Sequence, residues 1–394
     1  MTRHTLVKLA VGTAVAVVLA LWASSSKSPV SEVAGAGSAL VPGLSGALND
    51  VTTLRVVEAG DKAVVTLQRV EDRWQVAERS GYAADIGKVR ETLIRLADAT
   101  LLEAKTANPE RHSVLGVEDV AAATAKGTRV EIEGKVAAKI VVGTYSAQGG
   151  GSFVRRNDEA QVWLAKGELV ADRQPTNWLA KDLVDIGSDR IMRVELRQGD
   201  ATFAVAKQSP EQSNYQVEPM PAGRELLSEY EPNGIASMLA GLKFDDVAKA
   251  DSVLPDPTSL RVATIRSFDG LVVEITGFES EGKRYVTFKA TVDAERAELA
   301  ARAAQLNAVA EHQRANPPQP ADAAPAAAAT EVAKAEPAPL AVTDPAAFQA
   351  ERRKAIESEA AALNRRLDGW AYVLPAYKYA NMDKRLEDLL KPKG

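Results

Sequence analysis

Apolar and polar residues alternate along residues 53–78, which is the pattern of β-strands that bury one face. The alternation breaks at Gly60-Asp61 and again at Glu71-Asp72, and such residue pairs favour the tight turns of β-hairpins. The segment therefore predicts an antiparallel meander of short strands.

The same pattern returns at residues 192–219, about 140 positions later in the chain. Gly199-Asp200 stands at its first turn, and Tyr215-Gln216-Val217 takes the place of Trp74-Gln75-Val76. Because turn and strand residues match in the same order, we interpret the two segments as copies of one meander.

A helix is expected after each meander, because the apolar positions change there to helical spacing. Asp85 can cap the first helix and Asn233 the second, since their side chains can accept hydrogen bonds from free backbone N–H groups. The predicted buried residues are Ile86, Val89, Leu93 and Leu96 in the first helix, and Ile235, Met238, Leu239 and Leu242 in the second.

Further landmarks repeat beyond these helices. Ser113-Val114-Leu115 in the first half matches Ser252-Val253-Leu254 in the second. A pair of alternating strands follows in both halves, at residues 128–145 and 260–278. The sequence thus predicts an α+β fold of two tandem units, each made of an antiparallel sheet and a helix.

The end of the second unit differs from the end of the first. The first unit closes with a hairpin at residues 152–169 and a helix over residues 176–186. The second unit begins the equivalent hairpin at residues 283–292, but no return strand follows directly. The matching pattern comes only at residues 369–390, where Asn381 can cap the closing helix.

The intervening residues predict a helical arm. Residues 293–313 and a second stretch that ends at Leu367 are rich in alanine, glutamate and arginine, which favours helix formation. A proline- and alanine-rich tract separates them. We therefore expect residues 285–292 to pair with residues 370–374, and residues 293–368 to form an inserted helical hairpin arm.

The N-terminus has the features of a membrane segment. An apolar run from Leu9 to Ala23 follows Arg3 and Lys8 and precedes a serine-rich stretch. We interpret residues 1–25 as an uncleaved transmembrane helix, with a cleaved signal segment as the alternative. The positive-inside rule then puts the N-terminus in the cytoplasm and the bulk of the chain in the periplasm, anchored to the inner membrane.

Composition excludes several classes of function. A net charge of −5 leaves no general attraction to nucleic acid, so no nucleic-acid partner is expected. The chain has no cysteine, which excludes thiolate catalysis and iron–sulfur clusters, and its 3 histidines are too few and too scattered for a histidine zinc centre. No metal and no small-molecule cofactor are predicted.

No catalytic motif stands out. Gly149-Gly150-Gly151 lacks the lysine and the strand-to-helix context of a phosphate-binding loop, so we interpret it as a flexible turn. Close carboxylates such as Asp182 with Asp185, or Asp245-Asp246, are typical of solvated surfaces in a chain with 53 Asp and Glu residues. His112 is interpreted as a polar loop residue, and the chain is not expected to be an enzyme.

Aromatic residues gather near the C-terminus. Trp370 and Tyr372 are expected to fill a strand face in the core. Tyr377 and Tyr379, beside Lys378, are expected at its margin, so Tyr377, Lys378 and Tyr379 form the candidate interaction surface.

Residues 73–101, 113–119 and 140–156, with the closing residues 369–390, resemble a bacterial family defined by the domain of unknown function 4340. In that family a tryptophan-bearing strand leads through an A-D-x-x-x-V helix start to a Leu-Gly loop. Members typically carry one N-terminal membrane segment, and many are encoded near ABC-type transport components related to gliding-motility auxiliary proteins. The resemblance implies an extracytoplasmic accessory role and supplies no catalytic residues.

These observations define the expected organisation and function. After the membrane segment and a flexible tether over residues 26–50, the first unit should span residues 51–188, and the second should combine residues 189–292 with residues 369–394. The predicted function is a non-enzymatic accessory or scaffold subunit that assists membrane transport proteins through the units and the arm. The alternative is a module that binds envelope glycan or peptide in a groove between the units.

Overall fold

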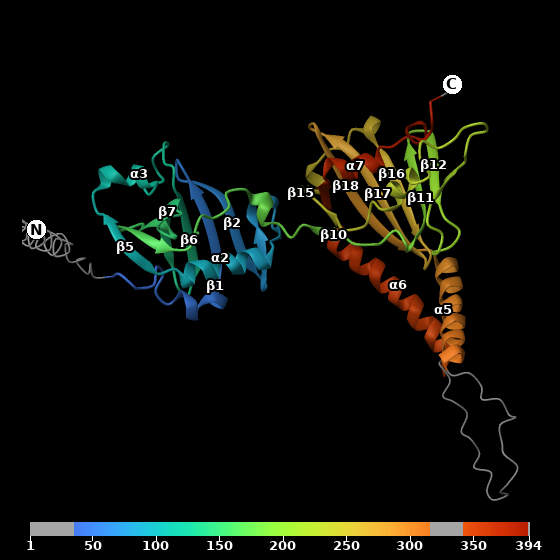
Figure 1. The fold of residues 1–394 in the computed structure, drawn as a ribbon, viewed down its shortest axis with the longest axis horizontal. Helices are drawn as coiled ribbons and strands as arrows, with labels where there is room; N and C mark the ends of the chain where they lie inside the picture. The colour runs from blue at the N-terminus through green and yellow to red at the C-terminus, as the bar shows by residue number, and fades with distance from the viewer. Residues whose placement is uncertain (1–34, 316–341, 393–394) are drawn as a thin grey trace, which may run out of the picture. The chain divides into compact units, whose positions relative to one another are not determined.

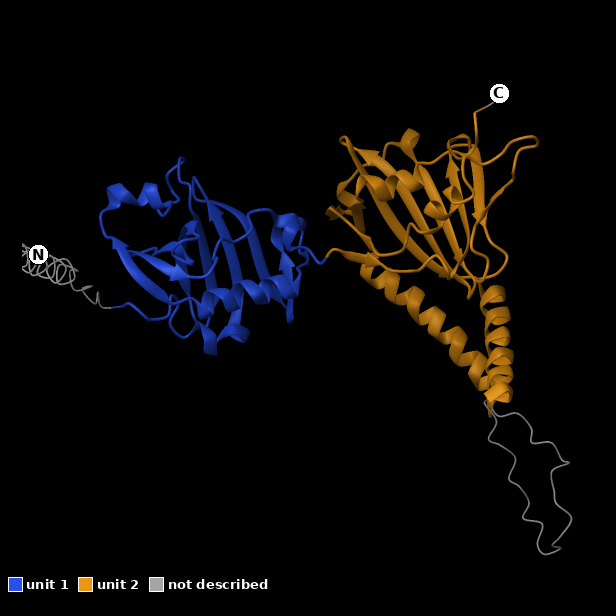
Figure 2. Ribbon diagram, viewed as in Figure 1, with its two compact units in different colours: residues 1–180 blue, residues 181–394 orange. Residues whose placement is uncertain are grey.

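A computed structural model of the chain describes residues 35–315 and 342–392. It is a mixed α+β structure with two large antiparallel sheets and few helices, divided into two compact units between Ala180 and Lys181 (Figure 2). This divide lies shortly before the predicted unit boundary at residue 188. The expected membrane segment, residues 26–34 of the tether and most of the proline- and alanine-rich tract lie outside the described residues. The prediction of a flexible tether is wrong for residues 35–50, because Leu40 and Leu44 are buried and the N–H of Leu40 donates to the carbonyl of Ala99 at 2.7 Å. Across the described ranges, no helix is both long enough and apolar enough to cross a membrane.

The first unit is built on a nine-stranded antiparallel sheet with the order β4-β3-β2-β1-β6-β7-β8-β9-β5 (Figure 1). The predicted meander is confirmed as β1, β2 and β3, with Asp61 and Asp72 in left-handed conformation at its two turns. The strands are β1 (Val51–Glu58), β2 (Lys62–Val70), β3 (Arg73–Val76), β4 (Tyr82–Ala83), β5 (Leu101–Thr106), β6 (Thr128–Gly134), β7 (Ala138–Ser146), β8 (Gly151–Arg156) and β9 (Val162–Lys166).

The second unit contains an eight-stranded antiparallel sheet with the order β13-β12-β11-β16-β17-β18-β19-β15. A separate two-stranded sheet pairs β10 with β14. The strands are β10 (Asp182–Val184), β11 (Ile191–Gln198), β12 (Ala201–Ala206), β13 (Gln216–Glu218), β14 (Leu242–Lys243), β15 (Asp246–Lys249), β16 (Arg261–Ser267), β17 (Leu271–Ser280), β18 (Lys283–Val292) and β19 (Trp370–Val373).

The two large sheets have the same strand order. From β3 to β5, the first sheet corresponds position by position to the second sheet from β13 to β15, with every pair antiparallel in both. This agreement is what the repeated sequence pattern predicts, because equal patterns bury equal faces. The difference is β4, an edge strand of the first sheet that has no counterpart in the second.

Helix α2 (Ile86–Asp98) packs against the sheet of the first unit as predicted. The side chain of Asp85 caps it by accepting a hydrogen bond of 3.1 Å from the N–H of Lys88. Val89, Leu93 and Leu96 are buried, but Ile86 is exposed. The predicted burial of Ile86 is wrong because the first helical turn borders an open cleft.

The equivalent helix of the second unit, α4 (Glu231–Ala236), is much shorter than predicted. Asn233 lies inside it and does not cap it. The Asn233 side chain instead accepts a hydrogen bond of 3.0 Å from the N–H of Tyr215, which makes the side chain a link between helix and sheet. The predicted apolar residues are all buried, although Leu242 belongs to β14.

The two predicted closing helices are wrong in detail. Residues 176–186 form a 3-10 turn (Pro175–Trp178) followed by β10, because the backbone pairs with a neighbouring segment instead of with itself. The N–H of Asp85 donates to the carbonyl of Trp178 at 2.7 Å. In the second unit, helix α7 (Ala376–Met382) already contains Asn381, so this residue is not its cap.

The delayed return strand is confirmed. Strand β19 pairs antiparallel with β18, with Tyr285 opposite Val373 and Val286 opposite Tyr372. The ring of Tyr372 lies between those of Phe244 and Phe288, at centroid distances of 5.2 and 5.9 Å. The chain therefore completes the second sheet only after the inserted helices α5 (Ala294–Ala315) and α6 (Pro345–Leu367).

A loop covers part of the first sheet on the face away from α2. It contains the short helix α3 (His112–Leu115), and its Val117 and Val120 pack into an apolar cluster with Val141. His112 is buried, and its Nε2 lies 3.0 Å from the carbonyl oxygen of Ala160. The interpretation of His112 as a polar loop residue is therefore wrong, because it begins the short helix α3 and its side chain is buried.

Gly143 is required where this loop crosses β7, and replacing it by alanine is expected to destabilise the first unit by about 1–3 kcal/mol. A Cβ there would lie 2.2 Å from the carbonyl oxygen of Leu115, so backbone would have to move. Urea denaturation followed by circular dichroism measures the loss. The matched control is Gly46→Ala, where a Cβ meets nothing within 4 Å and stability should be nearly unchanged. Equal effects of the two substitutions would contradict this account.

Candidate interaction surfaces

The helical arm, formed by α5 and α6, is the largest element that lies outside the two sheets. Helices α5 and α6 leave the second sheet at separate points and meet at their far ends (Figure 1). Ala297 and Ala301 of α5 are buried at the arm's base, and small side chains there allow close approach of neighbouring backbone. The predicted helical hairpin is confirmed for the described residues.

Apolar packing and a side-chain amide hold the base of α6 on the sheet. Ala360, Leu363 and Leu367 are buried. The carboxamide of Asn364 accepts from the N–H of Ala290 and donates to its carbonyl oxygen, both at 2.8 Å. Asn364 thereby binds the backbone of β18 at a residue that β19 does not reach, which satisfies two backbone groups of the sheet.

An arginine adds an ionic clamp at the same base. The Nη1 and Nη2 atoms of Arg190 bind the two carboxylate oxygens of Glu359 on α6 at 2.8 and 2.7 Å, and its Nε binds Asp269 at 2.7 Å. The hydrogen bonds to Glu359 are the main reason that the pKa of Arg190 lies above its ordinary value, while burial opposes them. Such forked contacts fix direction as well as distance, so α6 is held in a defined orientation to its sheet.

The outer face of α5 is apolar in places. Leu299 and Leu306 are 52% and 66% exposed, and their separation of seven residues puts both on one side of the helix, with the exposed Ala303 between them. Nearby Arg302 and Glu298 form an ion pair one turn apart at 2.5 Å. The arm thus presents a narrow apolar stripe with charged neighbours.

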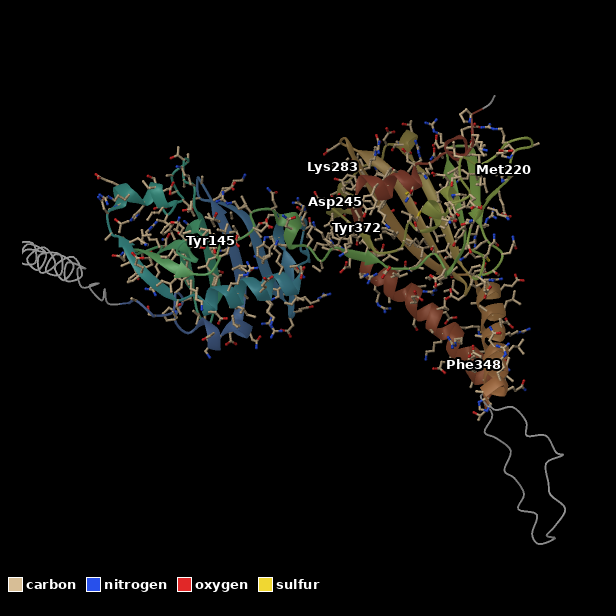
Figure 3. The ribbon with its side chains drawn as sticks, in the orientation of Figure 1. Tyr145, Met220, Asp245, Lys283, Phe348 and Tyr372 are labelled. Atoms are coloured by element: carbon tan, nitrogen blue, oxygen red, sulfur yellow. The ribbon has the colours of Figure 1, made fainter. Side chains whose placement is uncertain are left out.

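Helix α6 presents a basic segment. Arg352, Arg353 and Lys354 are exposed, and the guanidinium of Arg352 lies 5.3 Å from the ring centroid of the half-buried Phe348 near the far end of the arm (Figure 3). The arm therefore offers both apolar and cationic groups on elements whose base is fixed.

The predicted candidate surface of Tyr377, Lys378 and Tyr379 is divided by the structure. Tyr377 is 68% exposed, whereas Tyr379 is buried against β17. The ammonium of Lys378 donates to the carbonyl of Ala240 at 2.7 Å, and burial lowers its pKa. Only Tyr377 of the three presents a ring to solvent, because successive helical residues point in different directions.

The carboxylates considered as an acid–base pair contact lysine side chains or a backbone N–H group of the same unit. Asp182 pairs with Lys243 at 3.1 Å, and Asp185 accepts a hydrogen bond of 2.8 Å from the N–H of Gly241. Asp246 lies 3.6 Å from Lys283. Gly149 and Gly150 lie in the turn between β7 and β8, as predicted. Within the described ranges, no group of three or more metal-ligating side chains comes together.

Comparison with known proteins gives one result. No curated protein and no solved structure matches the chain. The model of a family described as "Domain of unknown function (DUF4340)" matches residues 74–261, from β3 of the first unit to the first residue of β16 in the second. The family that the sequence resembles is thus the one whose model, DUF4340, matches residues 74–261 of this chain.

Proposed function

We propose that the protein is a non-enzymatic accessory subunit of an ABC-type membrane transport complex, held at the periplasmic face of the inner membrane by its N-terminal segment. The arm of α5 and α6 is its contact for the partner protein. The observation that supports this function is an arm with a firmly held base and with Leu299 and Leu306 exposed on its outer face.

A fixed base favours binding through the arm. The contacts of Arg190 and Asn364 hold α6 before any partner arrives, so little conformational entropy is lost there on association. Burial of a leucine side chain contributes roughly 1.5–3 kcal/mol, and two on one helix face can anchor a helix or a groove of a partner. The basic residues of α6 would add electrostatic attraction to an acidic partner surface.

Replacing Leu299 and Leu306 together by glutamate is expected to reduce recovery of partner proteins at least tenfold, because charges would enter the apolar contact. The measurement is affinity purification of the tagged full-length protein from detergent-solubilised native membranes, read by quantitative mass spectrometry. The wild-type protein should recover a permease and an ATPase of one transport complex.

Leu254→Glu is the matched control, because Leu254 is 83% exposed in a loop outside the arm. The control variant should recover the same proteins as the wild type. Thermal melts of all three proteins should coincide, since the leucines that are changed are exposed. Equal recovery by the arm variant, or recovery of no transport component by the wild type, would refute the proposed function.

A further inference from the structure

The outer edge of the second sheet lacks a strand that the first sheet has. In the first unit β3 pairs with β4, with Gln75 opposite Ala83 and Val76 opposite Tyr82. In the second unit the equivalent strand β13 ends the sheet, and β12 is its one strand neighbour among the described residues. One sheet edge is therefore covered and its counterpart is open.

The segment that would supply the missing strand is paired elsewhere. In the first unit, residues 83–85 contact two neighbours at once: the N–H of Ala84 donates to Trp74 of β3 at 2.8 Å, and Ala83 accepts from Ala180 at 3.0 Å. In the second unit, residues 225–227 keep only the second type of contact. The N–H of Leu227 donates to Leu389 at 2.8 Å, and no ladder joins these residues to β13 in the described structure.

A groove lies at the position of the missing contact. It has a volume of about 590 Å³ and is lined by Tyr215 and Val217 at β13, by Leu226 of the displaced segment and by Met220. Met220 is 41% exposed and lies beside β12 in the second unit (Figure 3). The volume is in the range of roughly 300–1,000 Å³ that holds ligands. The lining combines these apolar and aromatic side chains with polar ones, among them Gln212, Asn214 and Glu229.

One backbone group at the open edge of β13 already has a hydrogen-bond partner. The N–H of Tyr215 donates to the side chain of Asn233, as described above. Val217 lies opposite Val205 of β12, but hydrogen bonds alternate along an antiparallel pair, so the backbone N–H and carbonyl of Val217 lie on the same open edge as those of Tyr215. The open stretch of the edge is therefore short and centred on Val217, similar in length to β4.

We propose that the open edge of β13 binds an extended segment of a partner protein as an added β-strand, with an apolar or aromatic side chain opposite Val217. Strand β4 shows what such a segment needs, because Tyr82 is buried opposite Val76 at the equivalent position. Main-chain hydrogen bonds supply the attachment and the groove selects the side chain. This site is independent of the arm and of the function proposed for it.

The test uses a synthetic peptide of residues 78–85, ERSGYAAD, which contains β4. Because the chain has no cysteine, Met220→Cys carries a single environment-sensitive fluorophore in the full-length protein. Titration should give a saturable signal with a Kd on the order of 0.1–1 mM, as suits a short segment with few hydrogen bonds. The same fluorophore at Tyr145→Cys, an exposed position of β7 in the first unit, should not respond.

Two altered peptides separate strand addition from nonspecific apolar binding. In the first unit the N–H groups of Gly81 and Ala84 donate to β3 at 3.1 and 2.8 Å, so methylation of these two peptide nitrogens should weaken binding at least tenfold. Replacing the peptide tyrosine by serine should weaken it similarly. Equal binding of the methylated and unmethylated peptides, or no saturable signal from the unmodified peptide up to 5 mM (roughly fivefold above the weakest expected Kd), would overturn the proposal.

Discussion

Replacing Tyr372 by alanine is expected to lower the free energy of unfolding of the second unit by about 3–5 kcal/mol. Its side chain is fully buried, and its ring contacts Phe244 and Phe288 from elements that are distant in sequence. Loss of the ring leaves a cavity that these neighbours fill only in part. The strand that carries Tyr372 also joins β18 to β15, so the loss should loosen both strand pairs.

Hydrogen exchange measured by mass spectrometry on the full-length protein can assign this effect to one unit. Amides of β15, β18 and β19 should lose protection, while those of residues 35–180 keep theirs. Tyr377→Ala is the matched control, because the same side chain is removed from an exposed position and should change stability by less than about 0.5 kcal/mol. If Tyr372→Ala behaves like this control, β19 does not complete the second core.

The pairing of β18 with β19 could be predicted from the sequence because the chain contains its own template. The first unit shows the complete order of strands, so the gap after residue 292 and the late strand at residue 370 could be recognised by comparison. Alternation along each strand then determined which face is buried. Neither argument needed the residues of the arm.

The helices at the unit ends were predicted poorly for a physical reason. Apolar residues at 179, 183, 184 and 186 suit a helical face, yet the backbone of residues 178–180 pairs with residues 83–85. Such long-range hydrogen bonds leave no local signal in the sequence. Asn233 and Asn381 were predicted as caps for the same reason, since a polar residue before an apolar run can equally bind a distant backbone group.

The prediction of the candidate surface from the sequence failed in part for the same reason. Tyr377 and Tyr379 look alike in sequence, but one is exposed and the other buried, because their directions on α7 differ and only Tyr379 faces β17. The clamp of Arg190 on Glu359 joins residues 169 positions apart, and the open edge of β13 is visible only beside its counterpart β3. Tertiary pairing, which periodicity does not encode, determines which of these groups reaches solvent.

The second large effect is expected from Trp178→Ala, which should lower the free energy of unfolding of the first unit by about 3–5 kcal/mol. The indole is fully buried, its N–H donates to the carbonyl of Asp172 at 3.0 Å, and the ammonium of Lys88 lies 4.8 Å from its centroid. Lys88 also binds the Asp172 carboxylate at 2.8 Å. Burial would raise the pKa of Asp172, but hydrogen bonds from Lys88 and its other partners outweigh burial and hold the pKa below its ordinary value. Removing the ring therefore disturbs a packed, charged assembly as well as the core.

Trp178→Phe separates the two contributions. Phenylalanine keeps most of the apolar volume and a face for the Lys88 ammonium but cannot donate to Asp172, so the expected loss is about 1–2 kcal/mol. Urea unfolding with hydrogen exchange as the unit-specific readout measures both variants. A loss confined to residues 35–180 is expected, because every contact named for Trp178 lies in the first unit. If Trp178→Phe lowers the free energy of unfolding as much as Trp178→Ala does, then the packed ring contributes little. The hydrogen bond to Asp172 would then be the main contact that holds the end of the first unit to helix α2.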